Sequence, residues 1–207
     1  MKSVALFGGT FNPIHYGHLA IAEEVRAKFN LDKVVFVPTF FPPHKEPEAL
    51  ANAQQRLIMA HLATVSNPCF EVSAFEVEKG GKSYSIDTVK HFRQLFGDKV
   101  QLYFLVGADM LMEISTWKNI DELLKLCRFI AVPRPGYDLQ KIFNHYFLAS
   151  ENYSIANDLL ENILIEDIAM LDISATNIRR RVKEWKSIKY LLPEAVEQFI
   201  HHQQLYL

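Results

Sequence analysis

Short runs of apolar residues alternate along the chain with stretches in which apolar residues have helical spacing. Residues 2–7 (KSVALF) and 33–37 (KVVFV) are rich in Val and Phe and end at Gly or Pro, as buried strands do. Between them, residues 16–29 carry apolar side chains on one helical face. A strand, a helix and a second strand in this order predict a βαβ unit, and hence a parallel sheet with a right-handed crossover.

The same alternation continues to about residue 170. It predicts helices over 51–65, 85–96 and 119–127 and strands over 70–78, 101–106, 128–132 and 163–170. We therefore expect the α/β class, with a Rossmann-like doubly wound parallel sheet whose ligands bind beyond the carboxyl ends of the strands. The stretch 38–50 contains four prolines and is the clearest long loop.

The last part of the chain, about 172–207, predicts a small helical portion. The segment ISATNIRRRVKEWKS is typical of a capped basic helix, and a final helix begins at Pro193. No linker rich in Gly, Ser or Pro divides the chain, and no internal repeat is present. We expect one domain over 1–207.

Composition narrows the class of partner. The 207 residues are 49% hydrophobic and carry a net charge of −2, whereas a protein that binds long nucleic acid is usually basic. No apolar stretch approaches the length of a membrane span, and the first apolar run is too short for a signal peptide. Cys69 and Cys127 lack zinc spacing and are expected to be buried thiols. These features favour small-molecule substrates, neither nucleic acid nor membrane as partner, and a cytoplasmic location; they leave a homo-oligomer open.

The segment GGTFNPIHYGHL, residues 8–19, holds the first candidate chemistry. Gly8 and Gly9 directly follow a strand, where we expect a tight turn that comes close to a ligand. His15 and His18 are three apart at the start of a helix and so share one face, and Gly17 removes a side chain between them. A helix N-terminus attracts anions, and two imidazoles there can donate hydrogen bonds to phosphate oxygens. Zinc binding is the alternative, but no third ligand is evident nearby, so we expect no metal held by the protein alone.

The segment ISATNIRRR, residues 173–181, is the second candidate. Ser174 or Thr176 can cap the helix, and Arg179 then lies near its first turn beside free N–H groups. Taken alone, this pattern is more typical of a capped surface helix with solvated arginines. Together with the first motif, it predicts a second phosphate-binding element.

The two segments resemble signatures of the nucleotidyltransferase superfamily, G-x-F-x-P-x-H-x-G-H and I-S-S-T-x-I-R. The resemblance implies transfer of a nucleotidyl group from ATP or CTP with release of pyrophosphate, with His15, His18 and Arg179 as catalytic residues. Asn12 stands where relatives often have Asp and receives no catalytic role, and Ala175 replaces the second Ser. The ATP-binding residues that the resemblance implies are Gly8, Gly9, Thr10, Phe11, His15, His18, Lys45, Gly107, Asp109, Ser174, Thr176 and Arg179.

Further segments are similar to bacterial nicotinate-nucleotide adenylyltransferases: PPHK at 42–45, SYSIDT at 83–88, GADML at 107–111 and VPRPGY at 132–137. This similarity covers essentially the whole chain. It implies nicotinate mononucleotide as the acceptor, bound by Thr88, Trp117, Tyr84 and His44, with Trp117 stacked on the nicotinate ring. It also implies Mg²⁺ as the cofactor that accompanies ATP.

Two alternatives remain at this stage. Another adenylyltransferase of the superfamily would share the first motif but use nicotinamide mononucleotide or pantetheine phosphate as acceptor. A non-catalytic nucleotide sensor could share the fold. Because both histidines of H-x-G-H and Arg179 are present, the sequence argues against an inactive site.

Overall fold

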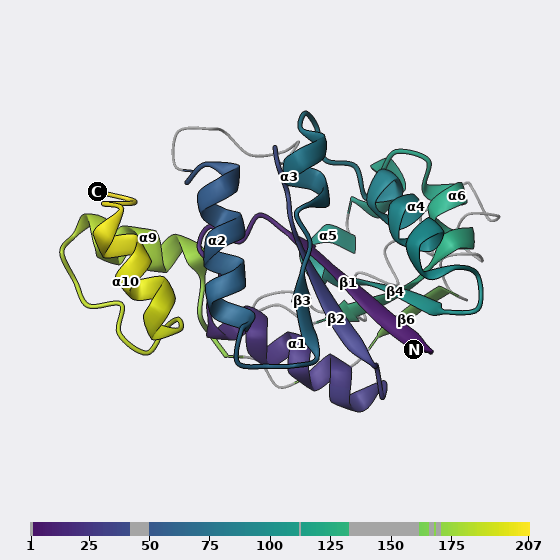
Figure 1. The fold of residues 1–207 in the computed structure, drawn as a ribbon, viewed down its shortest axis with the longest axis horizontal. Helices are drawn as coiled ribbons and strands as arrows, with labels where there is room; N and C mark the ends of the chain where they lie inside the picture. The colour runs from purple at the N-terminus through teal and green to yellow at the C-terminus, as the bar shows by residue number, and fades with distance from the viewer. Residues whose placement is uncertain (1, 42–49, 112, 133–161, 166–167, 169–170) are drawn as a thin grey trace.

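The computed structural model describes residues 2–41, 50–111, 113–132, 162–165, 168 and 171–207. Its centre is a six-stranded parallel sheet in the order β3-β2-β1-β4-β5-β6 (Figure 1). The strands are β1 (Ser3–Gly9), β2 (Lys33–Pro38), β3 (Phe70–Val72), β4 (Gln101–Gly107), β5 (Arg128–Val132) and β6 (Ile163–Ile165). This is the doubly wound Rossmann-type order, so the predicted fold class is confirmed.

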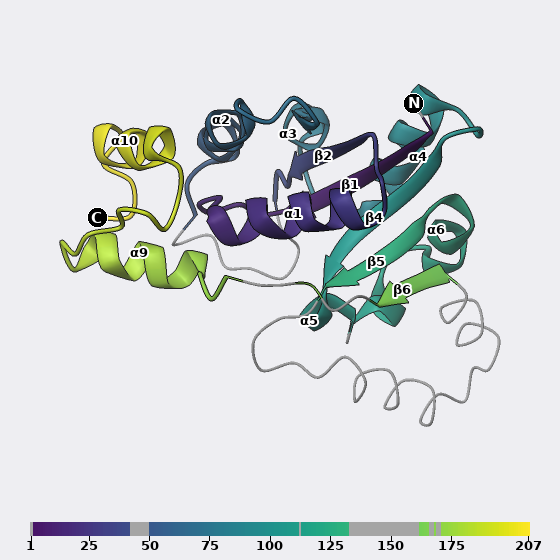
Figure 2. The same ribbon diagram turned by 90° about the horizontal axis from the view of Figure 1, so that it is seen from below.

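Helices cover both faces of the sheet. They are α1 (Tyr16–Lys28), α2 (Ala53–Thr64), α3 (Phe75–Lys79), α4 (Ser85–Phe96), α5 (Ala108–Leu111) and α6 (Ile120–Leu126), with a 3₁₀ turn at Ile114–Thr116. Two more, α9 (Ala175–Lys183) and α10 (Glu194–His202), lie together at one end of the molecule, beside α2 (Figures 1 and 2). None of the helices in the described ranges is long and apolar enough to cross a membrane.

Alternate residues of each strand feed two separate cores. In β1, Ala5 and Phe7 join the core formed with α1, α2, α9 and α10, whereas Val4 and Leu6 join the core formed with α4 and α6. Both faces of a central parallel strand are buried, so the strand has a continuous apolar run. This explains why β1, β2, β4 and β5 could be recognised from their composition.

One predicted strand is mostly wrong. Residues 70–78 alternate in polarity, but only Phe70–Val72 pair in the sheet and Phe75–Lys79 form α3. The backbone N–H of Ser73 still donates to the carbonyl of Phe36, at 2.9 Å. The Ser73 hydroxyl then accepts from the N–H of Phe75 at 3.2 Å, which turns the chain away from the sheet. A local side-chain bond therefore overrides the period-two pattern.

The sheet topology selects one place for a ligand. From β1 the chain crosses to β2, on one side of β1, whereas from β4 it crosses to β5, on the other side of β4. The connections therefore diverge between β1 and β4, at the carboxyl ends marked by Gly9 and Gly107. Such a switch point is where doubly wound sheets bind ligands. The first motif follows β1, and the GADML segment begins at the end of β4.

Packing at the end of β1 gives a first testable prediction. A Cβ on Gly9 would lie 2.9 Å from Cζ of Phe11, a side chain that is only 2% exposed. We expect Gly9→Ala to lower the free energy of unfolding by about 1–3 kcal/mol, because Phe11 has no room to move aside. Gly8→Ala provides the comparison, since its Cβ would meet only the tip of Phe104, at 3.1 Å. Urea denaturation of both variants checks the prediction, and an equal loss in the two would contradict it.

Candidate active site

The turn between β1 and α1, residues 10–15, lies at the switch point. The prediction that Gly8 and Gly9 make this turn is wrong, because both still belong to β1 and neither is among the residues with positive φ. The left-handed residue is Phe11, with φ 47°. The glycines instead leave room for two aromatic rings, that of Phe104 beside Gly8 and that of Phe11 beside Gly9.

The two histidines of the first motif are brought together at the start of α1. His15 is the N-cap residue and is buried, while His18 is half-buried, and their rings stack with centroids 3.7 Å apart. The backbone N–H of His15 donates to Nδ1 of His18 at 3.3 Å. Since Nδ1 then acts as acceptor, the neutral His18 ring carries its proton on Nε2.

The basic helix α9 docks directly on this turn. Ser174 is its N-cap and accepts from the N–H of Asn177 at 3.2 Å, so of the two predicted caps Ser174 is the one observed. Arg179 donates from Nη1 to the carbonyl oxygen of Asn12 at 2.8 Å, and from Nη2 to the hydroxyl of Thr176 at 3.4 Å. The two motifs, 167 residues apart at this bond, thus form one surface.

Gly17 also contributes to the docking of α9. A Cβ at this position would lie 3.0 Å from the His15 ring and 3.4 Å from the carbonyl oxygen of Ile173. The missing side chain therefore makes room for the His15 ring and for the segment before α9, in addition to any approach of a ligand.

Asn12 joins further parts of the chain to the turn. It is buried, and its Oδ1 accepts from the N–H of Ala51 at 3.0 Å and from the hydroxyl of Tyr206 at 2.8 Å. Burial raises the pKa of Tyr206, which keeps this hydroxyl protonated as a donor. The side-chain oxygen of Asn12 thus links Ala51 and Tyr206 to the turn.

The carboxyl end of β4 lies beside this surface. Gly107 is the last residue of β4, and Asp109 follows in α5. Trp117 comes directly after the 3₁₀ turn and is half-buried, with T-shaped contacts to Phe104 at 6.0 Å and Phe129 at 6.1 Å between ring centroids. Because Phe104 also packs beside Gly8, it connects Trp117 to the end of β1.

The segment 83–88 forms the start of α4. Tyr84 is the residue before the helix, and Nζ of Lys118 lies 4.4 Å from the centroid of its ring, which places Tyr84 close to Trp117 in the structure. Thr88 is only 1% exposed, and its hydroxyl donates to Oε1 of Glu76 in α3. The Thr88 proton is therefore directed away from a ligand, which sequence reasoning did not foresee.

His44 and Lys45 lie outside the described residues, as does the segment VPRPGY after its first residue, Val132. Their assigned roles remain predictions.

Sequence reasoning missed one residue of this region, Arg56 of α2. Its side chain is 1% exposed and its guanidinium bonds three backbone carbonyls around the turn. A signal was present, because Arg56 occupies the same helical face as the buried residues Met59, Ala60 and Ala63. A charged residue within an apolar stripe requires partners in the interior.

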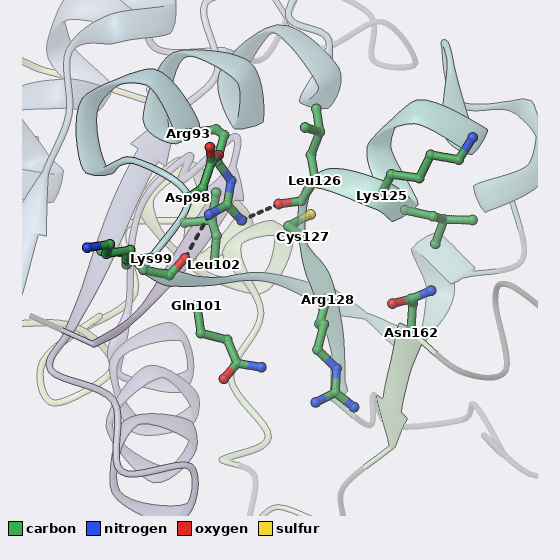
Figure 3. A pocket seen from close by; sticks show the side chains of 12 residues that line it. Arg93, Asp98, Lys99, Gln101, Leu102, Lys125, Leu126, Cys127, Arg128 and Asn162 are labelled. Carbon is green, nitrogen blue, oxygen red and sulfur yellow. Dashed lines mark hydrogen bonds between the residues drawn. The ribbon is translucent and has the colours of Figure 1, made fainter.

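The amino ends of the strands, opposite the switch point, are not part of this site. A cavity of about 310 Å³ lies at the amino ends of β4 and β5, lined by residues that include Arg93, Lys99, Lys125 and Arg128 (Figure 3). Arg93 is committed there to structure, since it donates to the carbonyls of Gly97, Val100 and Leu126. None of the sequence motifs reaches this edge.

Burial raises the pKa of the Cys127 thiol to about 12, so it is protonated and inert near neutral pH. Cys69 is only partly buried, contrary to expectation, and both cysteines are free thiols. Over the described ranges, no group of three His, Cys, Asp or Glu side chains is placed to hold a metal ion. Around the turn, the described residues bring together the imidazoles of His15 and His18 and the guanidinium of Arg179.

This arrangement, an H-x-G-H helix and an arginine helix on the switch point of a doubly wound sheet, defines an α/β nucleotidyltransferase. Residues 6–181 match the cytidylyltransferase-like family model. The chain is 47% identical over 204 residues to a probable nicotinate-nucleotide adenylyltransferase of Thermoanaerobacter, covering 98% of this chain and 93% of the relative. It is 48% identical over 203 residues to one of Moorella thermoacetica, covering 98% and 91%. The chain belongs to the nicotinate-nucleotide adenylyltransferase family.

Solved structures share the fold of this chain. The nicotinic acid mononucleotide adenylyltransferase of Plasmodium falciparum, complexed with NaAD, superposes with a TM-score of 0.76 at 19% identity, over 100% of this chain and 98% of that one. A second structure of that enzyme, complexed with APC, gives a TM-score of 0.73 at 18% identity, with 100% and 98% covered. At such identities the likeness establishes the fold.

The buried carboxyl of Glu76 gives a prediction on pH. Burial raises the pKa of Glu76 above its ordinary value of 4.5, against the opposing effect of hydrogen bonds from Ser83 and Thr88 and of the charge of Lys79. Above pH 4.5 the unfolded chain releases this proton while the folded protein still holds it. The contribution of Glu76 to the free energy of unfolding therefore falls as pH rises through the folded pKa.

We expect Glu76→Gln to remove this dependence, because an amide does not titrate and its oxygen still accepts from Thr88. The variant should gain stability relative to the parent as pH rises above 4.5. Urea denaturation at a series of pH values measures the difference. Glu78→Gln, on the exposed side of the same helix, is the control. A constant difference between parent and Glu76→Gln at all pH values would refute the prediction.

Proposed function

We propose that this protein transfers AMP from ATP to nicotinate mononucleotide, giving nicotinate adenine dinucleotide and pyrophosphate, as a step of NAD synthesis. The observation that carries the proposal is the meeting of His15, His18 and Arg179 around one turn, through the bond from Arg179 to Asn12. The relatives at 47% and 48% identity, which are named as probable nicotinate-nucleotide adenylyltransferases, support the same activity.

The chemistry needs donors and alignment, with no general base. A phosphate oxygen of the mononucleotide is already an oxyanion; it forms the new bond to the α-phosphorus as the bond to the bridging oxygen of pyrophosphate breaks. His18 would donate from Nε2 to the α-phosphate as charge develops there. Arg179, Ser174 and the start of α9 would hold the β- and γ-phosphates, with Thr176 beside them. His15, in turn, would contact the triphosphate from the N-terminus of α1.

Mg²⁺ would be carried by ATP itself. The described residues around the turn are donors and cations, which suit phosphate oxygens better than they suit a metal ion. A magnesium ion would therefore be held mainly by phosphate oxygens and water, and would neutralise part of the triphosphate charge. Asp109, which follows β4, would bond the ribose hydroxyls of the adenosine.

The acceptor would bind where Trp117 and Tyr84 lie. Trp117 would stack on the nicotinate ring. The N–H groups at the start of α4 would meet the nicotinate carboxylate, helped by the helix dipole. Thr88 would support this end of the site indirectly. Its hydroxyl is bonded to Glu76, so it would hold the first turn of α4 in place. His44 and Lys45 would act near the phosphates.

Loss of the His18 ring tests the catalytic assignment. We expect His18→Ala to lower kcat by about 10²- to 10³-fold, the effect of removing one donor to developing charge, with a smaller change in ATP binding. Pyrophosphate release measures kcat, and calorimetry with ATP alone measures binding. His61→Ala, an exposed histidine of α2, is the control. Near-parental turnover of a folded His18→Ala variant would exclude this role.

Comparing acceptors tests the substrate. Nicotinate and nicotinamide mononucleotides differ in one group, a carboxylate against an amide. Donors that satisfy both carboxylate oxygens would face the amide NH₂, so one charge-assisted hydrogen bond is lost. A loss of about 1.5–3 kcal/mol corresponds to roughly 10- to 150-fold preference for the nicotinate form in kcat/KM.

Initial rates of pyrophosphate release with each mononucleotide measure this preference. Trp117→Ala should weaken both acceptors similarly, because stacking does not sense the carboxylate; its thermal stability should be compared with that of the parent. Equal use of both mononucleotides, or preference for the nicotinamide form, would disprove the acceptor assignment. A parent that releases no pyrophosphate with either one would disprove the whole proposal.

A further inference from the structure

Arg56 is a buried cation whose hydrogen-bond acceptors, among the described residues, are all backbone oxygens. Its Nε donates to the carbonyl of Ala51 at 3.0 Å, Nη1 to that of Thr10 at 2.8 Å and Nη2 to that of Phe40 at 2.9 Å. The described residues offer it no carboxylate in an ion pair, and burial lowers its pKa. An arginine stays charged in a protein, so three carbonyl dipoles must balance one interior charge. We call these four residues the Arg56 clamp.

The clamp spans both halves of the proposed site. Thr10 begins the turn that carries the two histidines, on the ATP side. Phe40 contacts the segment on the acceptor side, because its N–H donates to the hydroxyl of Ser83 at 3.0 Å. The next residue, Phe41, forms a β-bridge with Lys82. Ser83 is followed at once by Tyr84, at the start of α4. One guanidinium therefore connects the phosphate-binding turn to the segment that positions the acceptor.

The bond from Arg56 to Ala51 supports the same turn as the bond from Arg56 to Thr10. Ala51, whose carbonyl accepts from Arg56, donates its own N–H to Oδ1 of Asn12. The carbonyl of Asn12 is the group bonded by Arg179. The turn is thus fixed at Thr10 and at Asn12, on both sides of the left-handed residue Phe11.

An apolar residue in place of Arg56 could fill the same volume without the cost of a buried charge. A planar fork with donors in fixed directions does something that an apolar side chain or a lysine cannot: it holds three separate backbone segments in one mutual geometry. In-line transfer between two bound substrates requires such a geometry, since the reacting atoms must approach to about 3–3.5 Å in alignment.

We infer that Arg56 is a positioning residue for nucleotidyl transfer, which sets the distance between the ATP-binding turn and the acceptor-binding start of α4. The inference rests on the proposed function. Arg56 touches neither substrate in this scheme and acts through Thr10, Phe40 and Ser83.

The test separates positioning from stability. We expect Arg56→Lys to bind ATP and nicotinate mononucleotide singly within about threefold of the parent, while kcat falls roughly 10- to 100-fold. Lysine keeps the charge but cannot reach three carbonyls in the same fork. Calorimetry with each substrate alone, pyrophosphate release with both, and thermal unfolding supply the readouts.

Arg93→Lys is the matched control. Arg93 also bonds three backbone carbonyls, but at the amino ends of the strands. Figure 3 shows the bond to Leu126. The Arg93→Lys variant should lose thermal stability, and its kcat should stay within about twofold of the parent value. If Arg56→Lys loses stability like the control and retains a kcat within threefold of the parent, Arg56 is structural only and the inference is overturned.

Ser83→Ala keeps the test decisive if Arg56→Lys does not fold. This change removes the acceptor of the Phe40 N–H and also the hydrogen bond from Ser83 to the carboxyl of Glu76, while leaving Arg56 itself in place. We expect kcat to fall about three- to tenfold with the affinity for ATP unchanged. A parental kcat in Ser83→Ala would overturn the inference. A parent without pyrophosphate release would instead refute the proposed function, and the inference with it, which distinguishes the two failures.

Discussion

Asn12 is the point on which the site depends, because both of its oxygens accept hydrogen bonds from distant parts of the chain. Its carbonyl receives Arg179 of α9, and its side-chain oxygen receives the N–H of Ala51 and the hydroxyl of Tyr206. A buried amide oxygen left without these donors would cost about 1–3 kcal/mol, so the bonds are strongly favoured together. They hold α2, α9 and the segment after α10 against the turn that follows β1.

The chemistry follows from the kind of groups that this arrangement collects. The described residues near the turn offer the imidazoles of His15 and His18, the guanidinium of Arg179 and the N-termini of two helices. All of them can donate hydrogen bonds, and none is an ionised carboxylate that would repel a triphosphate. The bond from the N–H of His15 to Nδ1 of His18 orients the proton of His18 before any ligand arrives. Such preorganised donors stabilise charge without reorganisation during the reaction.

The buried arginine and the buried carboxyl show how the interior serves the site indirectly. Arg56 and Glu76 are both more than nine-tenths buried, and each is bonded to a segment to which we assign a substrate contact, Thr10 for the first and Thr88 for the second. Both carry a desolvation cost that an apolar core would not have. We attribute their retention to the geometry that they impose on neighbouring segments.

The sequence by itself determined the parallel sheet, most of the helices that cover it and the two motifs that meet at the end of β1. Central strands are apolar on both faces and helix caps use few residue types, so local composition sufficed for β1, β4, α4 and Ser174. Only the tertiary structure decided that Gly8 and Gly9 make room for aromatic rings, that residues 75–79 leave the sheet as α3, and that the proton of Thr88 points to Glu76. The partners of Arg56 could not be predicted from the sequence either, because its three acceptors are backbone carbonyls, which every residue possesses. Hydrogen bonds of this kind depend on which segments meet in space, and no pattern of side chains along the chain encodes that.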